Sequence, residues 1–194
     1  MKTTAQSKTR TLTECAILLA MSFALSYVKL FRMPMGGSIT LASMLPVLFV
    51  GIKHGSRWGF GTAFVYSLTQ LFQALMSGDV FVWCETWDIW LLCALFDYIL
   101  PFTLLGLSSM FKTSRLNLYL GVSLTITLRF ACHYVSGVLI WGQWAENMSP
   151  YLYSFLYNGA LLLPELLICL VVLVPLLEVK QVRRLLGITH EHFN

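Results

Sequence analysis

The sequence contains little charge for its length. Of its 194 residues, 11% are charged and 57% are hydrophobic, and the mean hydropathy is +0.73. Soluble globular domains average about 25% charged and about 45–50% apolar residues. A membrane-spanning helix takes about 20 apolar residues, so the chain has room for roughly six crossings and for no soluble domain. The composition therefore predicts one integral membrane domain over residues 1–194, an all-α bundle of six transmembrane helices.

Several motifs of catalysis and metal binding are also missing. There is no P-loop, so we expect the chain not to hydrolyse ATP itself. There is no HExxH, no GxSxG and no pair of intramembrane carboxylates at catalytic spacing, so we expect no catalytic residues and no enzyme. The five cysteines form no CxxC and are interpreted as core thiols, so neither a metal site nor a cofactor is expected. The two halves show no evident repeat, which argues against an inverted-repeat secondary transporter.

Six apolar segments are present instead. A Pro34-Met35-Gly36-Gly37 turn separates the first two, and Pro46 interrupts the second. No cleavage motif follows the first segment, so it is expected to be retained as a signal-anchor helix. The predicted spans are residues 12–31, 39–52, 58–76, 89–111, 116–141 and 151–177.

The basic residues predict the orientation of these spans. With six crossings, one side carries Lys2, Lys8, Arg10, Lys53, Arg57, Lys112, Arg115, Lys180, Arg183 and Arg184. The other side carries only Arg32, with Lys29 near it, and the acidic loop 77–88. Lysine and arginine collect on the cytoplasmic side of membrane proteins. Both termini are therefore predicted to be cytoplasmic.

A stripe of unusual residues runs along the fifth segment. Arg129, His133, Gly137 and Trp141 are four residues apart, so on a helix they share one face. A face that meets only lipid has no use for these residues. A lone helical histidine is more often a packing residue, and a lone glycine a helix contact. Together with Trp141, which offers an aromatic face to a ring or a cation, they favour a ligand-binding face.

Asp97 lies mid-way along the fourth segment, next to Tyr98. A carboxylate at the bilayer centre costs about 2.5–3.5 kcal/mol on insertion scales, so it should face a partner or a cavity. One interpretation is an ion pair with Arg129. The other is a counter-charge for a cationic ligand, and the two can coexist.

The sixth segment carries Tyr153, Asn158 and Glu165 toward one side. Asn158 is either a bridge between two helices or a ligand contact. Glu165 lies deeper, and a structural ion pair with Arg129 is its expected role.

The first segment has small residues at Ala16, Ala20 and Ala24. Small residues at this spacing allow another helix to approach closely. They predict either packing inside the bundle or a docking surface for a separate membrane subunit.

At this point the chain resembles a known family. Residues 36–59, GGSITLASMLPVLFVGIKHGSRWG, look like the second-helix segment of the substrate-binding S components of energy-coupling factor (ECF) transporters. AILLA at 16–20 is similar to the AxxxA motif by which that family docks its coupling subunit. LFDY (95–98), RFACHYVSGVLIW (129–141) and YSFLYNG (153–159) resemble the thiamine-specific branch. The resemblance covers roughly residues 12–184.

The resemblance implies a protein of the prokaryotic plasma membrane that captures thiamine from outside. It implies as partners a transmembrane coupling subunit, two ATPase subunits and the lipid bilayer. No contact with nucleic acid is expected. Asp97 would face the thiazolium, and the rings and hydroxyethyl tail would be held by Tyr98, His133, Trp141, Tyr153 and Asn158, with Gly137 lining the pocket. Relatives have a tryptophan on the first outer loop where this chain has Gly36-Gly37. Tyr66, Trp87 and Trp90 are therefore candidates for further ring contacts.

The chemistry of the residues favours the same ligand. Thiamine is a permanent cation with two flat rings, and the chain offers one carboxylate, aromatic faces and hydrogen-bonding groups for it. A neutral flavin or an anionic biotin would not require Asp97. Two alternatives stay open: an S component for another vitamin or a thiamine precursor, and an intramembrane enzyme or stand-alone structural protein.

Overall fold

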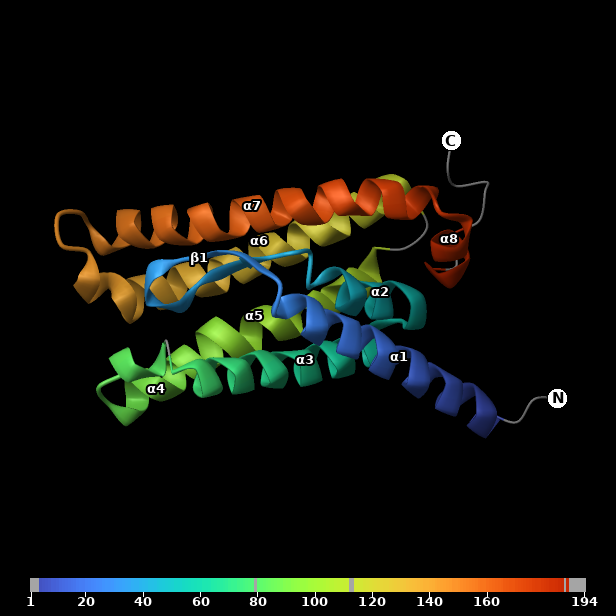
Figure 1. The fold of residues 1–194 in the computed structure, drawn as a ribbon, viewed down its shortest axis with the longest axis horizontal. Helices are drawn as coiled ribbons and strands as arrows, with labels where there is room; N and C mark the ends of the chain where they lie inside the picture. The colour runs from blue at the N-terminus through green and yellow to red at the C-terminus, as the bar shows by residue number, and fades with distance from the viewer. Residues whose placement is uncertain (1–3, 79, 112–113, 187, 189–194) are drawn as a thin grey trace.

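The computed structural model describes residues 4–78, 80–111, 114–186 and 188. This part of the chain is mostly helical, with one two-stranded antiparallel hairpin. The main elements in chain order are α1 (Thr4–Ser26), β1 (Lys29–Arg32), β2 (Ser38–Thr40), α2 (Leu45–His54), α3 (Ser56–Ser77), α4 (Trp87–Cys93), α5 (Leu100–Thr103), α6 (Arg115–Leu139), α7 (Pro150–Glu178) and α8 (Lys180–Leu186). Short 3-10 turns lie at η1 (Pro34–Gly36), η2 (Phe81–Trp83), η4 (Leu104–Met110) and η5 (Trp141–Trp144), and a π-helical turn, η3, at Ala94–Ile99. Figure 1 shows α3, α5, α6 and α7 along the long axis, with α1 crossing obliquely.

Three continuous helical stretches are long and apolar enough to cross a membrane. They are Trp87–Met110, Arg115–Leu139 and Pro150–Glu178, and Leu45–His54 is a shorter apolar helix. The first of them runs through α4, η3, α5 and η4 without a break. The predicted spans 89–111, 116–141 and 151–177 fall on these three stretches, within two residues at each end. The predicted span 58–76 lies inside α3.

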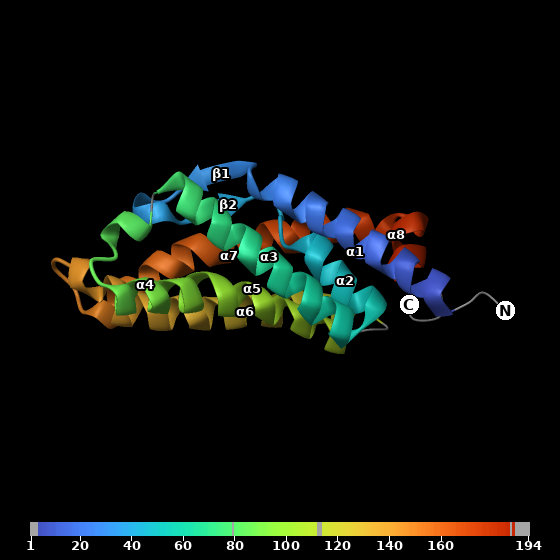
Figure 2. The same cartoon turned by 90° about the horizontal axis from the view of Figure 1, so that it is seen from below.

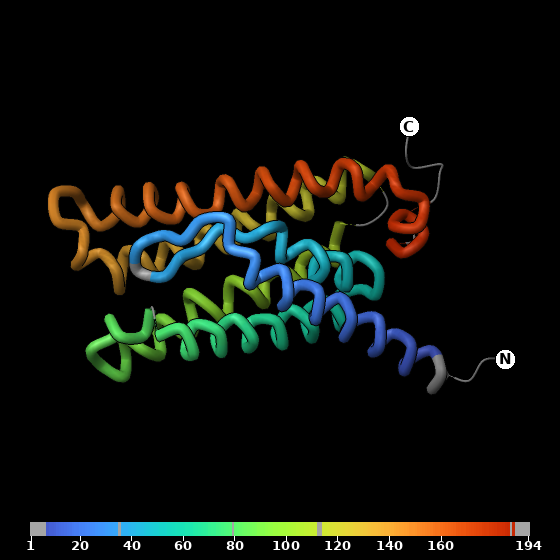
Figure 3. Tube along the Cα trace, viewed as in Figure 1, coloured from blue at the N-terminus to red at the C-terminus, as the bar shows by residue number. Residues whose placement is uncertain are grey.

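The prediction was wrong between the first two spans. Residues 12–31 were expected to be helical, but α1 ends at Ser26 and Lys29–Arg32 form β1. Residues 39–40 belong to β2. A short apolar run does not by itself distinguish a helix from a strand, and here the turn at 34–37 joins the two halves of a hairpin. Figure 3 shows this hairpin leaving α1 and returning to α2.

The second helix also begins later than expected. It starts at Leu45, and Pro46 lies in its first turn rather than interrupting it. Proline is well tolerated there, because the first helical N–H groups have no partner inside the helix. The Oγ of Ser22 on α1 accepts a hydrogen bond from the backbone N–H of Val47 at 3.2 Å, which joins the start of α2 to α1.

Glycines allow backbones to meet where α2, α3 and η4 pack together. A Cβ on Gly59 would lie 2.7 Å from the Cα of Gly51, and a Cβ on Gly106 would lie 2.7 Å from the Cα of Phe60. Any larger residue at these positions would push the helices apart. Close packing through small residues is the usual way in which membrane helices associate.

The two ends of the bundle differ. The start of α1 and the short helix α8 lie at one end, called here the α8 end, and α4 and η5 lie at the other, the α4 end (Figures 1 and 2). Arg57, in the first turn of α3, is exposed. Of the charged residues used to predict the orientation, Lys2 and Lys112 lie outside the described residues, as does Asp79 of the acidic loop.

Candidate functional site

A cavity lies between the hairpin, the π-helical turn η3, α6 and α7. Its walls come from segments far apart in sequence, which places it inside the bundle. The lining residues are Gly36, Gly37, Ser38, Thr40, Ser43, Gln70, Val80, Asp97, Tyr98, Phe102, Arg129, His133, Gly137, Trp141, Tyr153, Tyr157, Asn158, Leu161 and Glu165. We call it the central cavity. It contains seven of the ten residues that the sequence predicted to contact a ligand.

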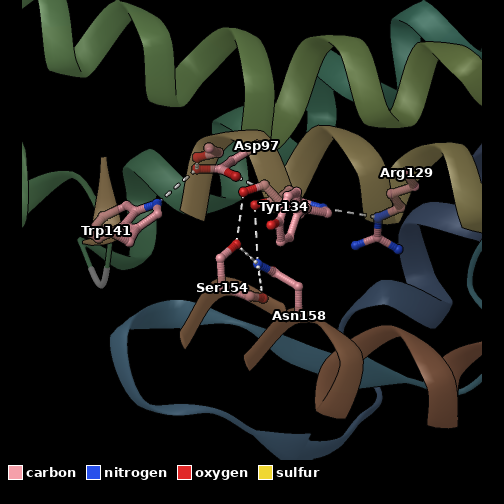
Figure 4. A network of polar contacts seen from close by, with 8 residues as sticks. Asp97, Arg129, Tyr134, Trp141, Ser154 and Asn158 are labelled. Atoms are coloured by element: carbon pink, nitrogen blue, oxygen red, sulfur yellow. Dashed lines mark hydrogen bonds and ion pairs between the residues drawn. The ribbon is translucent and has the colours of Figure 1, made fainter. Parts of the chain in front are cut away.

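Asp97 accepts hydrogen bonds from three side chains of the α6–η5 segment. Its Oδ1 lies 3.0 Å from Nδ1 of His133. Its Oδ2 accepts from Oγ of Ser136 at 2.6 Å and from Nε1 of Trp141 at 3.1 Å. Asp97 lies on the π-helical turn η3, a type of irregularity that is frequent at functional sites. Figure 4 shows Trp141 pointing toward this carboxylate.

The partners of His133 define its tautomer. Arg129 donates from Nε to Nε2 of His133 at 3.3 Å. An arginine N–H can only donate, so Nε2 must accept and carries no proton. The ring proton is then on Nδ1, where it is donated to Asp97. His133 is therefore the neutral tautomer, and it supplies Asp97 with a hydrogen bond but with no positive charge.

Arg129 has its own counter-ion. Its Nη1 lies 2.9 Å from Oε2 of Glu165, and both side chains are buried. Thr40 of the hairpin donates to the other oxygen of Glu165 at 2.6 Å. The guanidinium also lies over the ring of Phe102, 4.3 Å from its centroid. Arg129 therefore reaches Asp97 only through His133, and the direct Asp97–Arg129 ion pair considered from the sequence is not formed.

Aromatic side chains form the walls near Asp97. Tyr98 stacks on Phe81 with a centroid separation of 5.7 Å. Tyr153 and Tyr157, one turn apart on α7, stack at 6.0 Å. Tyr157 also donates from its hydroxyl to the backbone carbonyl of Pro34, which ties the tip of the hairpin to α7. The cavity thus combines one carboxylate with several ring faces.

Gly137 and Asn158 hold α6 and α7 close together. A Cβ on Gly137 would overlap the side chain of Ser154 and would lie 3.0 Å from Nδ2 of Asn158. Asn158 donates from Nδ2 to the carbonyl of His133 at 3.1 Å, and Ser154 donates to the carbonyl of Tyr134 at 2.8 Å. Figure 4 shows Ser154 and Asn158 reaching toward α6. Both residues bridge the two helices, and Asn158 also lines the cavity, so its contact with a ligand stays a prediction beside its role as a bridge.

Three residues predicted to contact a ligand lie outside the central cavity. Tyr66 is fully buried, and its hydroxyl donates to Oγ of Ser43, which does line the cavity. Trp87 is 75% exposed and stacks on Trp90 at 5.4 Å. Both tryptophans lie in α4, before the π-helical turn that carries Asp97 into the bundle. None of these three residues lines the central cavity, and their ligand contacts stay predictions.

The predicted docking face of α1 is not covered by the other described elements of the bundle. Ala16, Ala20 and Ala24 are all exposed, whereas Leu18 and Ser22 on the other side of the helix are buried. In the described part of the chain, these alanines are therefore not used for close packing inside the bundle.

Some residues of the site escaped the sequence analysis. Thr40, Ser43 and Gly37 were assigned to a membrane helix or a turn, because the hairpin was not recognised. Ser136 stands beside Gly137 in the motif at 129–141, but no role was predicted for it. Tyr157 was the most accessible omission, since it lies one turn after Tyr153 and next to Asn158, on a helix that was predicted correctly in kind.

The comparison with known families decides the identity of the chain. The sequence model of a family described as "Thiamine transporter protein (Thia_YuaJ)" matches residues 12–185. The chain belongs to this thiamine transporter family.

Two known proteins that are similar to the chain agree with this assignment. The Thiamine transporter ThiT of Bacillus subtilis (strain 168) is 28% identical over 178 residues, which cover 84% of this chain and 87% of that protein. The solved structure of ThiT from Listeria monocytogenes has the same fold, with a TM-score of 0.69 over 94% of this chain and 100% of that one, at 20% identity. Together with its long apolar helices, membership of this family identifies the chain as a multi-pass protein of the cell membrane.

Proposed function

We propose that this chain is the substrate-binding S component of an ECF-type importer, and that it captures thiamine from outside the cell in the central cavity. The observation that carries the proposal is the set of partners of the Asp97 carboxylate. Its three donors, His133, Ser136 and Trp141, are neutral, and Arg129 is paired with Glu165. One negative charge in the cavity is thus left for the ligand to balance.

The ligand would be held by its charge and by its rings. The thiazolium would lie against Asp97, because a desolvated carboxylate favours a cation far more strongly than it does in water. Tyr98, Trp141 and Tyr153 would flank the two rings, and an aromatic face is worth about 0.5–2 kcal/mol to a cation. His133 and Asn158 would orient the polar edges, and Gly137 would leave room for a ring. Tyr157 and Gly37, which also line the cavity, join this set.

The proposal includes six crossings and a cytoplasmic location for both termini. The three stretches that are long and apolar enough support the last three crossings. For the first three we propose α1, the apolar helix α2 with the hairpin before it, and α3. The start of α1 and α8 lie at the same end of the bundle, as an even number of crossings requires.

The partners would be a transmembrane coupling protein and two ATPases. The chain has no P-loop, so the energy for uptake would come from those subunits. The exposed Ala16, Ala20 and Ala24 would form the contact with the coupling protein. The named relative is a transporter, and we propose no catalytic activity for this chain.

The decisive experiment is a binding titration of the purified chain followed by tryptophan fluorescence. Trp141 donates to Asp97, so a ring bound beside them should change its emission. Thiamine is expected to saturate one site, its separate pyrimidine and thiazole halves to bind more weakly, and riboflavin not to compete. Tight binding of riboflavin, or of a neutral precursor in preference to thiamine, would overturn the assignment.

A further inference from the structure

A second hollow adjoins the central cavity on the hairpin. It is lined by Lys29, Arg32, Met33, Gly36, Gly37, Ser38 and Trp83, and we call it the hairpin recess. Gly36, Gly37 and Ser38 also line the central cavity. A ligand in the central cavity could therefore extend into the recess past two residues that have no side chain.

An irregularity in the hairpin turns both basic residues to the same face. Lys29 pairs with Thr40, and Arg32 pairs with Ser38, with a register shift between Lys29 and Phe31. In a regular strand, residues three apart point to opposite faces, but an extra residue on one strand reverses that relation. Lys29 and Arg32 therefore share the face of Ser38 and Thr40. At Thr40, which donates to the buried Glu165, this face meets the bundle, whereas at Arg32 it is exposed at the rim of the recess.

The recess is basic and has an aromatic wall. Among the residues that the structure describes, none of the ion pairs uses Lys29 or Arg32. Trp83 forms the aromatic wall of the recess, and its edge-on contact with Trp144, at a centroid distance of 5.1 Å, holds its ring in place. The sequence also places these two basic residues alone on the side away from the other lysines and arginines. A cationic ligand does not explain these two positive charges, because they would repel it.

We propose that Lys29 and Arg32 form an anion subsite that binds the phosphate group of a thiamine phosphate ester, while the thiazolium of the same molecule faces Asp97. The inference rests on the proposed function. An arginine fork and a lysine ammonium together match the oxygens of a phosphate. The molecule then presents a negative inner site and a positive outer site, which complement a ligand with a cationic ring and an anionic tail.

The test compares thiamine with thiamine monophosphate in the whole chain. Both are titrated against the unchanged chain, the Lys29→Gln/Arg32→Gln variant, and the control Arg57→Gln/Arg184→Gln, whose residues are exposed. We expect the hairpin variant to lose about tenfold or more in affinity for the monophosphate, with the loss shrinking as salt is added. Its affinity for thiamine should stay the same or rise, because two positive charges have left the path of a cation.

The different expected changes in affinity for the two ligands distinguish the loss of a phosphate subsite from general damage to the hairpin. An equal loss for both ligands, or no loss for either, would overturn the subsite, whereas the Lys29→Arg/Arg32→Lys variant should keep its affinity for the monophosphate. Inorganic phosphate should compete with the monophosphate and not with thiamine. A lipid headgroup is the other possible source of phosphate, and it is tested by titrations in detergent without lipid and in nanodiscs with phosphatidylglycerol. If Lys29→Gln/Arg32→Gln loses the lipid but binds the monophosphate as before, the two residues form a lipid contact and the inference is wrong. A chain that binds neither thiamine nor the ester would contradict the proposed function itself.

Discussion

Asp97 is a partly buried carboxylate with an unusual set of partners. It accepts hydrogen bonds from His133, Ser136 and Trp141, and among the described residues no lysine or arginine pairs with it. Hydrogen bonds from neutral donors stabilise the charged form without cancelling the charge. The three hydrogen bonds therefore lower the free-energy cost of a charged carboxylate in the cavity, and its charge stays available to a cationic ligand.

Replacing this charge should weaken the binding of thiamine. Asp97→Asn keeps the size of the side chain and removes the counter-charge, so we expect a loss of about 1–3 kcal/mol in binding free energy. Isothermal titration calorimetry or tryptophan fluorescence measures it. Asp88→Asn, at an exposed position on α4, is the matched control and should bind as the unchanged chain does. A folded Asp97→Asn protein with unchanged affinity would remove the counter-charge role.

The ion pair between Arg129 and Glu165 should contribute to stability more than to binding. Glu165→Gln leaves a buried guanidinium without its counter-ion, so we expect a loss of about 3 kcal/mol in the free energy of unfolding. Glu178→Gln is the control, because Glu178 pairs with Arg115 at the surface and is 58% exposed. Its loss should stay below about 1 kcal/mol. Unfolding in denaturing detergent, followed by circular dichroism, compares the two, and similar losses would argue against a buried pair.

At the scale of single residues, the sequence predicted much of the site. Intramembrane Asp97, Arg129, His133 and Glu165 were identified because each is costly in hydrocarbon without a partner. The sequence predicted the ion pair of Arg129 with Glu165, which the structure contains, but it also left open a pair of Arg129 with Asp97. Residues that are ordinary in a membrane helix, such as Ser43 and Tyr157, gave no signal of their own.

Among the elements, the pair α6 and α7 depends on Gly137. In Gly137→Ala the new methyl group would overlap the Ser154 side chain, so we expect a loss of about 1–3 kcal/mol in unfolding free energy and weaker binding. Gly159→Ala on α7 is the control, because nothing lies within 4 Å of a Cβ there. That change should be neutral or stabilising by up to about 1 kcal/mol. Thermal unfolding of both variants decides, and an equally stable Gly137→Ala protein would show that the two helices are not held this closely.

The alanine face of α1 should matter for uptake and not for binding. Ala16→Trp/Ala20→Trp fills the exposed face, which does not line the central cavity, so thiamine affinity should be unchanged while uptake by cells is lost. Leu163→Trp is the control, because Leu163 is 60% exposed on α7. Normal uptake in the double variant, or a loss in the control of equal size, would exclude α1 as the docking surface.

Two elements could not be predicted from the sequence. The hairpin of residues 29–40 is apolar enough to pass for the end of one span and the start of the next, and only the pairing between its strands separates the two readings. The π-helical turn that carries Asp97 has no sequence signature. Both are local departures from regular helices, and both contribute side chains to the central cavity.

For the whole molecule, amino-acid composition and hydropathy were sufficient to predict a mostly helical membrane protein, although the predicted all-α bundle did not include the hairpin. The three long apolar stretches follow directly from runs of apolar residues. The first half of the chain was harder, because α2 has only ten residues and follows a hairpin. Length and hydropathy define a span only when one helix makes the whole crossing.

The orientation of the molecule can be tested with single cysteines. In a chain whose five cysteines are replaced by serine, Glu146→Cys at the α4 end and Arg184→Cys at the α8 end give two probes. A membrane-impermeant maleimide added to intact cells should label the first and not the second, because basic residues collect at the cytoplasmic side. Permeabilised cells are the control, in which both should react. Labelling of Arg184→Cys in intact cells would reverse the proposed topology.

The hydrogen bonds of His133 have a spectroscopic consequence. Its two ring nitrogens differ in kind, one protonated toward Asp97 and the other unprotonated toward Arg129, so their ¹⁵N resonances should be widely separated. A cation that binds to Asp97 draws on the same carboxylate that accepts from Nδ1. With ¹⁵N-enriched histidine, the imidazole is thus an internal reporter of occupancy beside the carboxylate that balances the charge of the ligand, and no foreign group has to be attached to the binding site.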